Sequence, residues 1–140
     1  MKHTFDATLA PADPDINGLL DKLQQFFADH GLHSSLVQCF ALTFDELISN
    51  IVMYGAAREP IQVHLSITDS EVSAWIIDDG VPFDPLSLPD PDVTSGVEER
   101  PVGGVGIYIA RKMMDRMTYE RDELRNRISL SKRIDTPTPE

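Results

Sequence analysis

The sequence predicts an α+β domain of two layers, in which helices pack on one face of a mostly antiparallel sheet. Two long segments near the N-terminus carry apolar residues at helical spacing, and four other segments alternate apolar with polar residues as strands do. The turn Asp69–Ser70 separates two of the alternating segments, which predicts an antiparallel hairpin. No linker divides the 140 residues, so one domain is expected.

The N-terminal part is expected to form one strand and two helices. Every second residue is apolar over His3–Leu9, as in a half-buried strand. Prolines and acids then interrupt the chain, and helical spacing runs from Asp15 to His30, where Gly31 closes it. A second helix is predicted from about Ser34 to Tyr54, with a glycine directly after it.

The remaining elements follow a change to period two. Strands are predicted over 61–67 and 72–77 because apolar residues alternate with polar ones there. Residues 84–100 hold several prolines and acids without periodicity, which indicates a long functional or mobile loop. A third helix is expected from Ile107 to about Met117, and a last strand from Ile128 to Lys132.

Composition narrows the function classes. The single cysteine, Cys39, excludes an intrachain disulfide. The N-terminus does not read as a signal peptide, and no apolar run approaches the roughly 20 residues of a membrane span, so we expect a cytoplasmic protein without a membrane partner. The formal net charge of −11 disfavours nucleic acid as a direct partner. Residues 135–140 are expected to form a disordered tail.

Glu46 and Asn50 form the first candidate site. They are four residues apart on the second predicted helix and therefore project from one face. A carboxylate can accept a proton from an attacking hydroxyl, and an amide oxygen is a suitable Mg²⁺ ligand. Taken alone, such a pair is more often an exposed pair on a helix surface than part of a site.

Asp78 and Gly80 form the second candidate site, at the abrupt end of an apolar strand. The Asp78 carboxylate can accept a hydrogen bond from an exocyclic amine such as that of adenine. Gly80 has no side chain, so a flat base could approach its backbone. The alternative is an ordinary Asp-Gly turn.

A glycine cluster precedes the third predicted helix and forms the third candidate site. Gly103, Gly104 and Gly106 leave backbone N–H groups free to face phosphates at a helix N-terminus. The cluster lacks the lysine of a P-loop and the preceding strand of a dinucleotide fold, so both of those readings are rejected.

These three motifs, in this order and with a long loop between the second and third, resemble those of the GHKL ATP-binding superfamily. The short chain, the Asp-x-Gly-x-Pro-Phe sequence at 78–83 and the Gly-Gly-x-Gly-Ile sequence at 103–107 are similar to the stand-alone anti-sigma-factor serine/threonine kinases. The resemblance implies a Bergerat-type two-layer ATP-binding domain over residues 1–134. It also implies an ATP lid at about 84–103.

The resemblance implies a role for each site residue. Glu46 would be the general base, Asn50 the Mg²⁺ ligand and Asp78 the adenine anchor, while the glycines Gly80, Gly103, Gly104 and Gly106 would shape the ATP pocket. Relatives often carry a basic residue near the γ-phosphate where this chain has Val102, and Arg100 is the candidate substitute.

The resemblance also implies partners. The protein would bind a sigma factor in one state, and in the other phosphorylate a STAS-type antagonist, in a partner-switching module that regulates transcription. A homodimer is left open. Two alternatives stay open as well, a non-catalytic ATP-binding interaction module and a regulator whose target is not a sigma factor.

Overall fold

The computed structural model describes residues 2–87 and 104–134. Within them the chain forms a five-stranded sheet, three α-helices and one short 3-10 turn. Along the chain the elements are β1 (His3–Leu9), α1 (Ile16–Asp29), α2 (Ser34–Tyr54), β2 (Ile61–Ile67), β3 (Glu71–Asp78), η1 (Pro85–Ser87), α3 (Gly104–Met113), β4 (Arg116–Arg121) and β5 (Asn126–Arg133).

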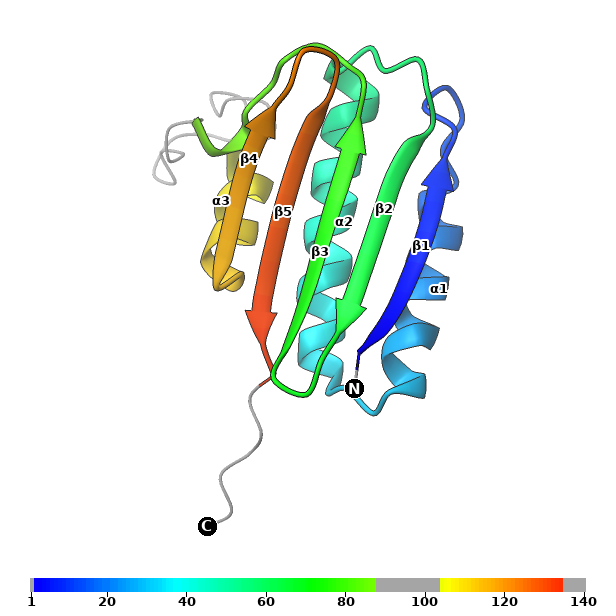
Figure 1. The fold of residues 1–140 in the computed structure, drawn as a ribbon, viewed down its shortest axis with the longest axis vertical. Coiled ribbons are helices and arrows are strands. Elements are labelled where there is room, and N and C mark those ends of the chain that lie inside the picture. The colour runs from blue at the N-terminus through cyan, green and yellow to red at the C-terminus, as the bar shows by residue number, and fades with distance from the viewer. Residues whose placement is uncertain (1, 88–103, 135–140) are drawn as a thin grey trace.

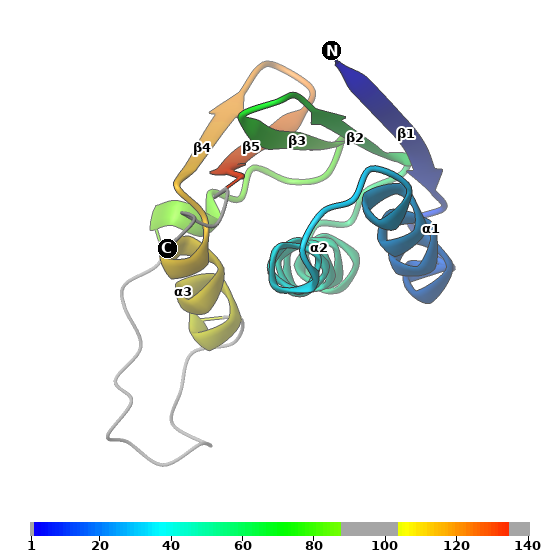
Figure 2. The same ribbon diagram turned by 90° about the horizontal axis from the view of Figure 1, so that it is seen from below.

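The sheet has the strand order β1-β2-β3-β5-β4, and each neighbouring pair is antiparallel (Figure 1). All three helices lie on one face of it, as the view along the strands shows (Figure 2). The predicted two-layer α+β architecture is therefore confirmed. In the pairing of β3 with β5, Asp78 lies opposite Asn126.

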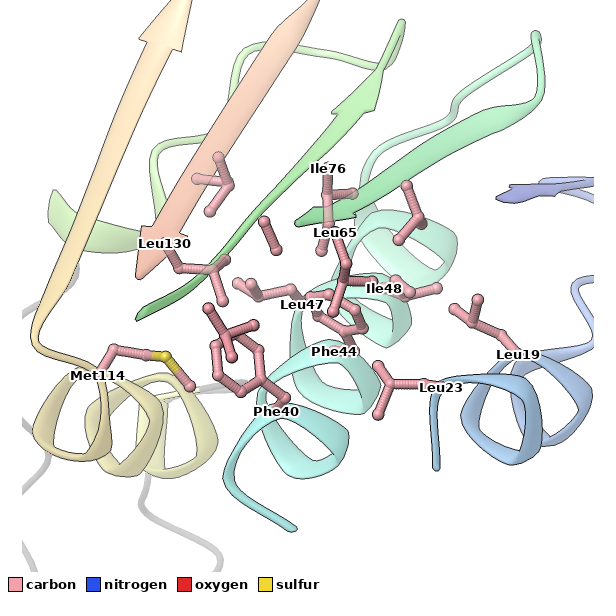
Figure 3. Packing of buried hydrophobic residues seen from close by; sticks show 14 of the residues in the cluster. Leu19, Leu23, Phe40, Phe44, Leu47, Ile48, Leu65, Ile76, Met114 and Leu130 are labelled. Carbon is pink, nitrogen blue, oxygen red and sulfur yellow. The ribbon is translucent and has the colours of Figure 1, made fainter. Parts of the chain in front are cut away.

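Helix α2 is the central element of the core. Its fully buried aromatic residues, Phe40 and Phe44, lie beside Leu47 and Ile48 and face the inward side chains of the strands (Figure 3). Burying each such side chain stabilises the fold by roughly 1.5–3 kcal/mol. By length and composition α2 could cross a membrane, but here its apolar side packs as the core helix of a domain.

The sequence prediction is wrong for the segment after the third helix. That helix ends at Met113 rather than near Met117, and Arg116–Arg121 forms the strand β4, which we did not expect. The methionines at 113, 114 and 117 continue helical spacing, but tertiary pairing overrides it. The Asp115 N–H donates to the Ser131 carbonyl at 3.0 Å, so the chain leaves the helix and pairs with β5.

The other predicted elements agree with the structure to within two residues at each end. Pro85–Ser87, at the start of the predicted lid, forms a single 3-10 turn. The rest of the predicted lid and the predicted tail, 88–103 and 135–140, lie outside the described residues.

Candidate functional site

The candidate site lies where the C-terminal half of α2 meets the upper ends of β3 and β5 in Figure 1. A mostly apolar recess there is lined by Asn50 from α2, Asp78 from β3 and Asn126 from β5. The fold thus brings the first two predicted motifs to one place. The remaining lining residues are Leu47, Ile51, Gly55, Val81, Phe83, Pro85 and Ile128.

Asp78 is a buried carboxylate held by one of its two oxygens. Its side chain is 5% exposed, and Oδ1 accepts the Gly80 N–H at 2.8 Å and Nδ2 of Asn126 at 3.2 Å. Within the described chain Oδ2 accepts no hydrogen bond. Burial raises the pKa of Asp78, and the two hydrogen bonds oppose that shift. Oδ2 is the atom that remains for a ligand's donor.

The Asn126 side chain forms hydrogen bonds with three segments, namely the end of β3, the turn after it, and β4. Its Nδ2 donates to Asp78 and, at 2.9 Å, to the Val81 carbonyl. Its Oδ1 accepts the Tyr119 hydroxyl proton and, at 3.5 Å, the Phe83 N–H. The side chain is 4% exposed, and each half of its amide has partners, as a stable buried amide requires.

The turn after Asp78 is fastened to the end of α2. The Val81 N–H donates to the Gly55 carbonyl at 2.7 Å, and Arg121 Nη1 donates to the Gly80 carbonyl at 2.8 Å. A Cβ at Gly80 would lie 2.3 Å from the Gly55 oxygen. The Gly55 carbonyl, directly after α2, therefore already requires a glycine at position 80, and the approach of a base to the Gly80 backbone stays a prediction.

Asp79 holds the segment that follows α2 in place through hydrogen bonds. Its Oδ1 accepts the backbone N–H groups of Arg58 and Glu59, at 2.8 and 3.1 Å. The hydrogen bond from Arg58, assisted by that from Glu59, lowers the pKa of Asp79. The pKa is therefore raised for Asp78, which is buried at the site, and lowered for Asp79, which stabilises the turn.

Asn50 is a buried polar residue whose amide lies near the Glu46 carboxylate but does not form a hydrogen bond with it. It is 6% exposed, and within the described chain its Nδ2 makes no hydrogen bond. An unsatisfied buried polar group of this kind costs about 1–3 kcal/mol. The amide borders the recess, where a bound ligand could supply the missing partner.

Glu46 lies one helical turn before Asn50 and contacts the first turn of α3. A Cβ added to Gly106 would lie 2.0–2.3 Å from the Glu46 carboxyl atoms, so the missing side chain makes room for them. Burial raises the pKa of Glu46, the Asn50 amide opposes the shift, and Asp45 adds to it. A carboxylate with a raised pKa is a stronger proton acceptor than an exposed one.

The structure brings together Glu46, Asn50, Asp78, Gly80 and Gly106. Gly104 is the first residue of α3, and Arg100 and Gly103 lie outside the described residues. Sequence reasoning gave no role to Asn126 and missed Tyr119 and Arg121. No local pattern marks these three, because strand register alone brings them to Asp78 and its turn.

Comparisons with known proteins identify a family and a relative. The family model of the histidine kinase-like ATPase domain matches residues 10–132. A serine/threonine-protein kinase, BtrW of Bordetella bronchiseptica, is 31% identical over 97 residues, which is 66% of this chain and 68% of that protein.

A solved structure shares the fold. It contains the RsbU and RsbW domains of Rv1364c from Mycobacterium tuberculosis, with a TM-score of 0.71 and 17% identity over 96% of this chain. This chain spans 33% of the length of that one. From its motifs, its fold and these likenesses, the chain belongs to the histidine kinase-like ATPase domain family, in the group of anti-sigma-factor serine/threonine kinases.

Proposed function

We propose that this chain binds ATP with Mg²⁺ and transfers the γ-phosphoryl group to a serine or threonine of a partner protein. The observation that carries the proposal is the joint placement of three features. Asp78 and Asn50 border one recess, and Glu46 lies one helical turn away against the first turn of α3. Adenine would lie at Asp78 and the triphosphate would extend toward Glu46 and α3.

The residues present fit a Mg²⁺ ion bound together with the triphosphate. Mg²⁺ at phosphate sites usually takes one or two protein ligands and completes its shell with phosphate oxygens and water. The buried Asn50 amide, with its unsatisfied Nδ2, can offer Oδ1 as that ligand. The described residues hold no cluster of three or more histidine, cysteine or acidic side chains. When bound, Mg²⁺ neutralises phosphate charge.

Glu46 would accept the proton of the attacking hydroxyl group. As the hydroxyl oxygen of the partner residue forms its bond to the γ-phosphorus, its proton passes to the Glu46 carboxylate. The bond between the γ-phosphorus and the bridging oxygen breaks, and ADP leaves with that oxygen. The raised pKa of Glu46 favours this proton transfer.

The partner proposed is a STAS-type antagonist, with a sigma factor as the second partner in a cytoplasmic partner-switching module. The likeness to the kinase BtrW and the fold shared with a chain containing an RsbW domain support this assignment. The predicted ATP lid at 84–103, with Arg100 near the γ-phosphate, belongs to the same proposal.

The test separates binding from chemistry by replacing Glu46 with Gln. We expect Glu46→Gln to keep the ATP affinity and to slow phosphoryl transfer about 10²–10⁴-fold, the usual contribution of a positioned base. Calorimetry measures the first quantity. Transfer of labelled phosphate to individually purified STAS-domain proteins of the source organism measures the second.

Glu71→Gln is the matched control, because Glu71 is exposed at the opposite end of β3. It should change neither quantity. If the parent protein binds ATP but labels none of the STAS-domain proteins, the kinase assignment fails and a nucleotide-controlled binding module replaces it. If the parent does not bind ATP, both assignments fail.

A further inference from the structure

We propose that Asn126 is the positioning residue that makes the site selective for a purine bearing a 6-amino group. It would do so by holding the Asp78 carboxylate so that Oδ2 faces the base. The inference rests on the proposed ATP-binding function and adds a determinant of base selectivity to it.

The orientation of the Asn126 amide follows from its neighbours. On one side it meets two donors, the Tyr119 hydroxyl and the Phe83 N–H. On the other it meets acceptors, the Asp78 carboxylate and the carbonyls of Gly80 and Val81. A flipped amide would place its oxygen against three acceptors, so Nδ2 must face Asp78.

As a result, the two Asp78 carboxylate oxygens have different hydrogen-bond partners. Oδ1 receives the Gly80 N–H and Asn126 Nδ2, whereas Oδ2 receives no hydrogen bond from the described chain. A free carboxylate oxygen that borders an apolar recess accepts a hydrogen bond and repels a carbonyl oxygen. Adenine presents an amine at C6, and hypoxanthine and guanine present a carbonyl oxygen there.

Without Asn126 the two Asp78 oxygens would no longer be distinguished in this way. Only the Gly80 N–H would then hold the carboxylate, which could rotate and turn either oxygen, or neither, toward the base. The recess would remain apolar and could still bind a purine ring. Asn126 is therefore expected to act on the recognition of the 6-amino group more than on binding as a whole.

Tyr119 adds a second support from a different strand. It lies on the edge strand β4, and its hydroxyl donates to Asn126 on the neighbouring strand β5. Tyr119→Phe removes one hydrogen bond to Asn126 and leaves the Phe83 N–H in place. Its effect on selectivity should have the same direction as that of Asn126→Ala and a smaller size.

The experiment compares ATP with purine riboside triphosphate, which differs from ATP by a hydrogen in place of the 6-amino group. Calorimetry with Mg²⁺ gives the ratio of the two affinities for the parent, Asn126→Ala, Tyr119→Phe and the control Ser129→Ala on β5. A hydrogen bond to a charged acceptor predicts a ratio of roughly 10 to 100 in the parent. The ratio should fall below about 3 in Asn126→Ala and take an intermediate value in Tyr119→Phe.

A purely structural role for Asn126 would weaken both nucleotides equally and leave the ratio at the parent value, which would overturn the proposal. If Asn126→Ala does not fold, an unchanged ratio in Tyr119→Phe overturns it in the same way. A parent that binds both nucleotides with equal affinity would overturn the role of Asp78 in amine recognition while ATP binding stands. A parent that binds neither nucleotide would overturn the proposed function itself.

Discussion

The two ends of the candidate site differ in how completely the protein satisfies its own polar groups. At the end formed by β3 and β5, Asn126 has hydrogen-bond partners at both amide atoms and Asp78 has two donors on Oδ1. At the end formed by α2 and α3, the Asn50 amide is buried with an unsatisfied Nδ2. Glu46 meets the backbone of α3 where Gly106 leaves room.

This difference indicates which polar groups find hydrogen-bond partners on folding and which one is left for a ligand to satisfy. The end assigned to the base is pre-organised, so binding there needs little rearrangement and can be selective. The end assigned to the phosphates carries an uncompensated polar group, and satisfying it would add to the affinity for a ligand. Functional sites commonly carry such a local cost in stability.

The largest effect expected is that two asparagine replacements change the free energy of unfolding of the nucleotide-free protein in opposite directions. Asn126→Ala should lower the free energy of unfolding by about 2–3 kcal/mol, because it leaves buried groups unpaired. Asn50→Leu, which keeps the branching of the side chain and removes the unsatisfied amide, should raise it by up to about 1 kcal/mol. Urea denaturation of both variants measures the difference.

Asn17→Ala, on the exposed face of α1, is the control and should stay within about 0.5 kcal/mol of the parent. Adding ATP and Mg²⁺ should stabilise the parent and leave Asn50→Leu unstabilised. If Asn50→Leu costs as much stability as Asn126→Ala, the two ends of the site are equally satisfied and the comparison fails.

A smaller effect is expected from Gly106→Ala, and it should depend on Glu46. The added Cβ would overlap the flexible end of the Glu46 side chain, so the change should cost up to about 1 kcal/mol of stability in the parent. In a Glu46→Ala background the overlap is gone, and the better helix propensity of alanine should make the change neutral or stabilising. The four proteins of this cycle are compared by urea denaturation without nucleotide.

Equal costs of Gly106→Ala in the two backgrounds would show that the glycine serves something other than Glu46. The predicted role of Gly106 in binding phosphate is separable, because that role affects nucleotide affinity and leaves the stability of the free protein unchanged.

The smallest effect expected is a pH dependence of stability at the same end. Burial raises the pKa of Glu46 in the folded protein, so the folded state binds its proton more tightly than the unfolded state does. The contribution of Glu46 to stability is therefore present at low pH and is lost as pH rises from the ordinary carboxyl pKa through the raised value. Relative to the parent, Glu46→Gln should gain stability across that window, as thermal unfolding between about pH 4 and pH 8 would show. A relative loss of stability with rising pH would mean that the folded protein favours the charged carboxylate.

The sequence predicted the two layers and all five strand and helix segments before residue 80 to within a residue, and it singled out Glu46, Asn50 and Asp78, which the fold brings together. It did so because each of these rests on a local pattern, such as the helical spacing of Glu46 and Asn50. It did not predict β4, whose residues Arg116–Arg121 carry no clear alternation, and it extended α3 into them.

The supports of Asp78 could not be predicted for a related reason. Tyr119 and Asn126 lie more than 40 residues after Asp78 and meet it only through the pairing of β3, β5 and β4. The contact of Gly80 with Gly55 could likewise not be predicted, because Gly55 comes from the end of a helix earlier in the chain. Contacts set by tertiary structure leave no periodic signature.

The pairing of Asp78 with Asn126 has a consequence for the accuracy of folding. Side chains alternate between the two faces of a sheet, so a slip of one residue between β3 and β5 would turn Asn126 to the face that carries no helices. On the proposal that Asn126 holds Asp78 toward the base, such a slip would remove the selectivity between purines. Purine selectivity would then report the correct pairing of β3 with β5 in each folded molecule.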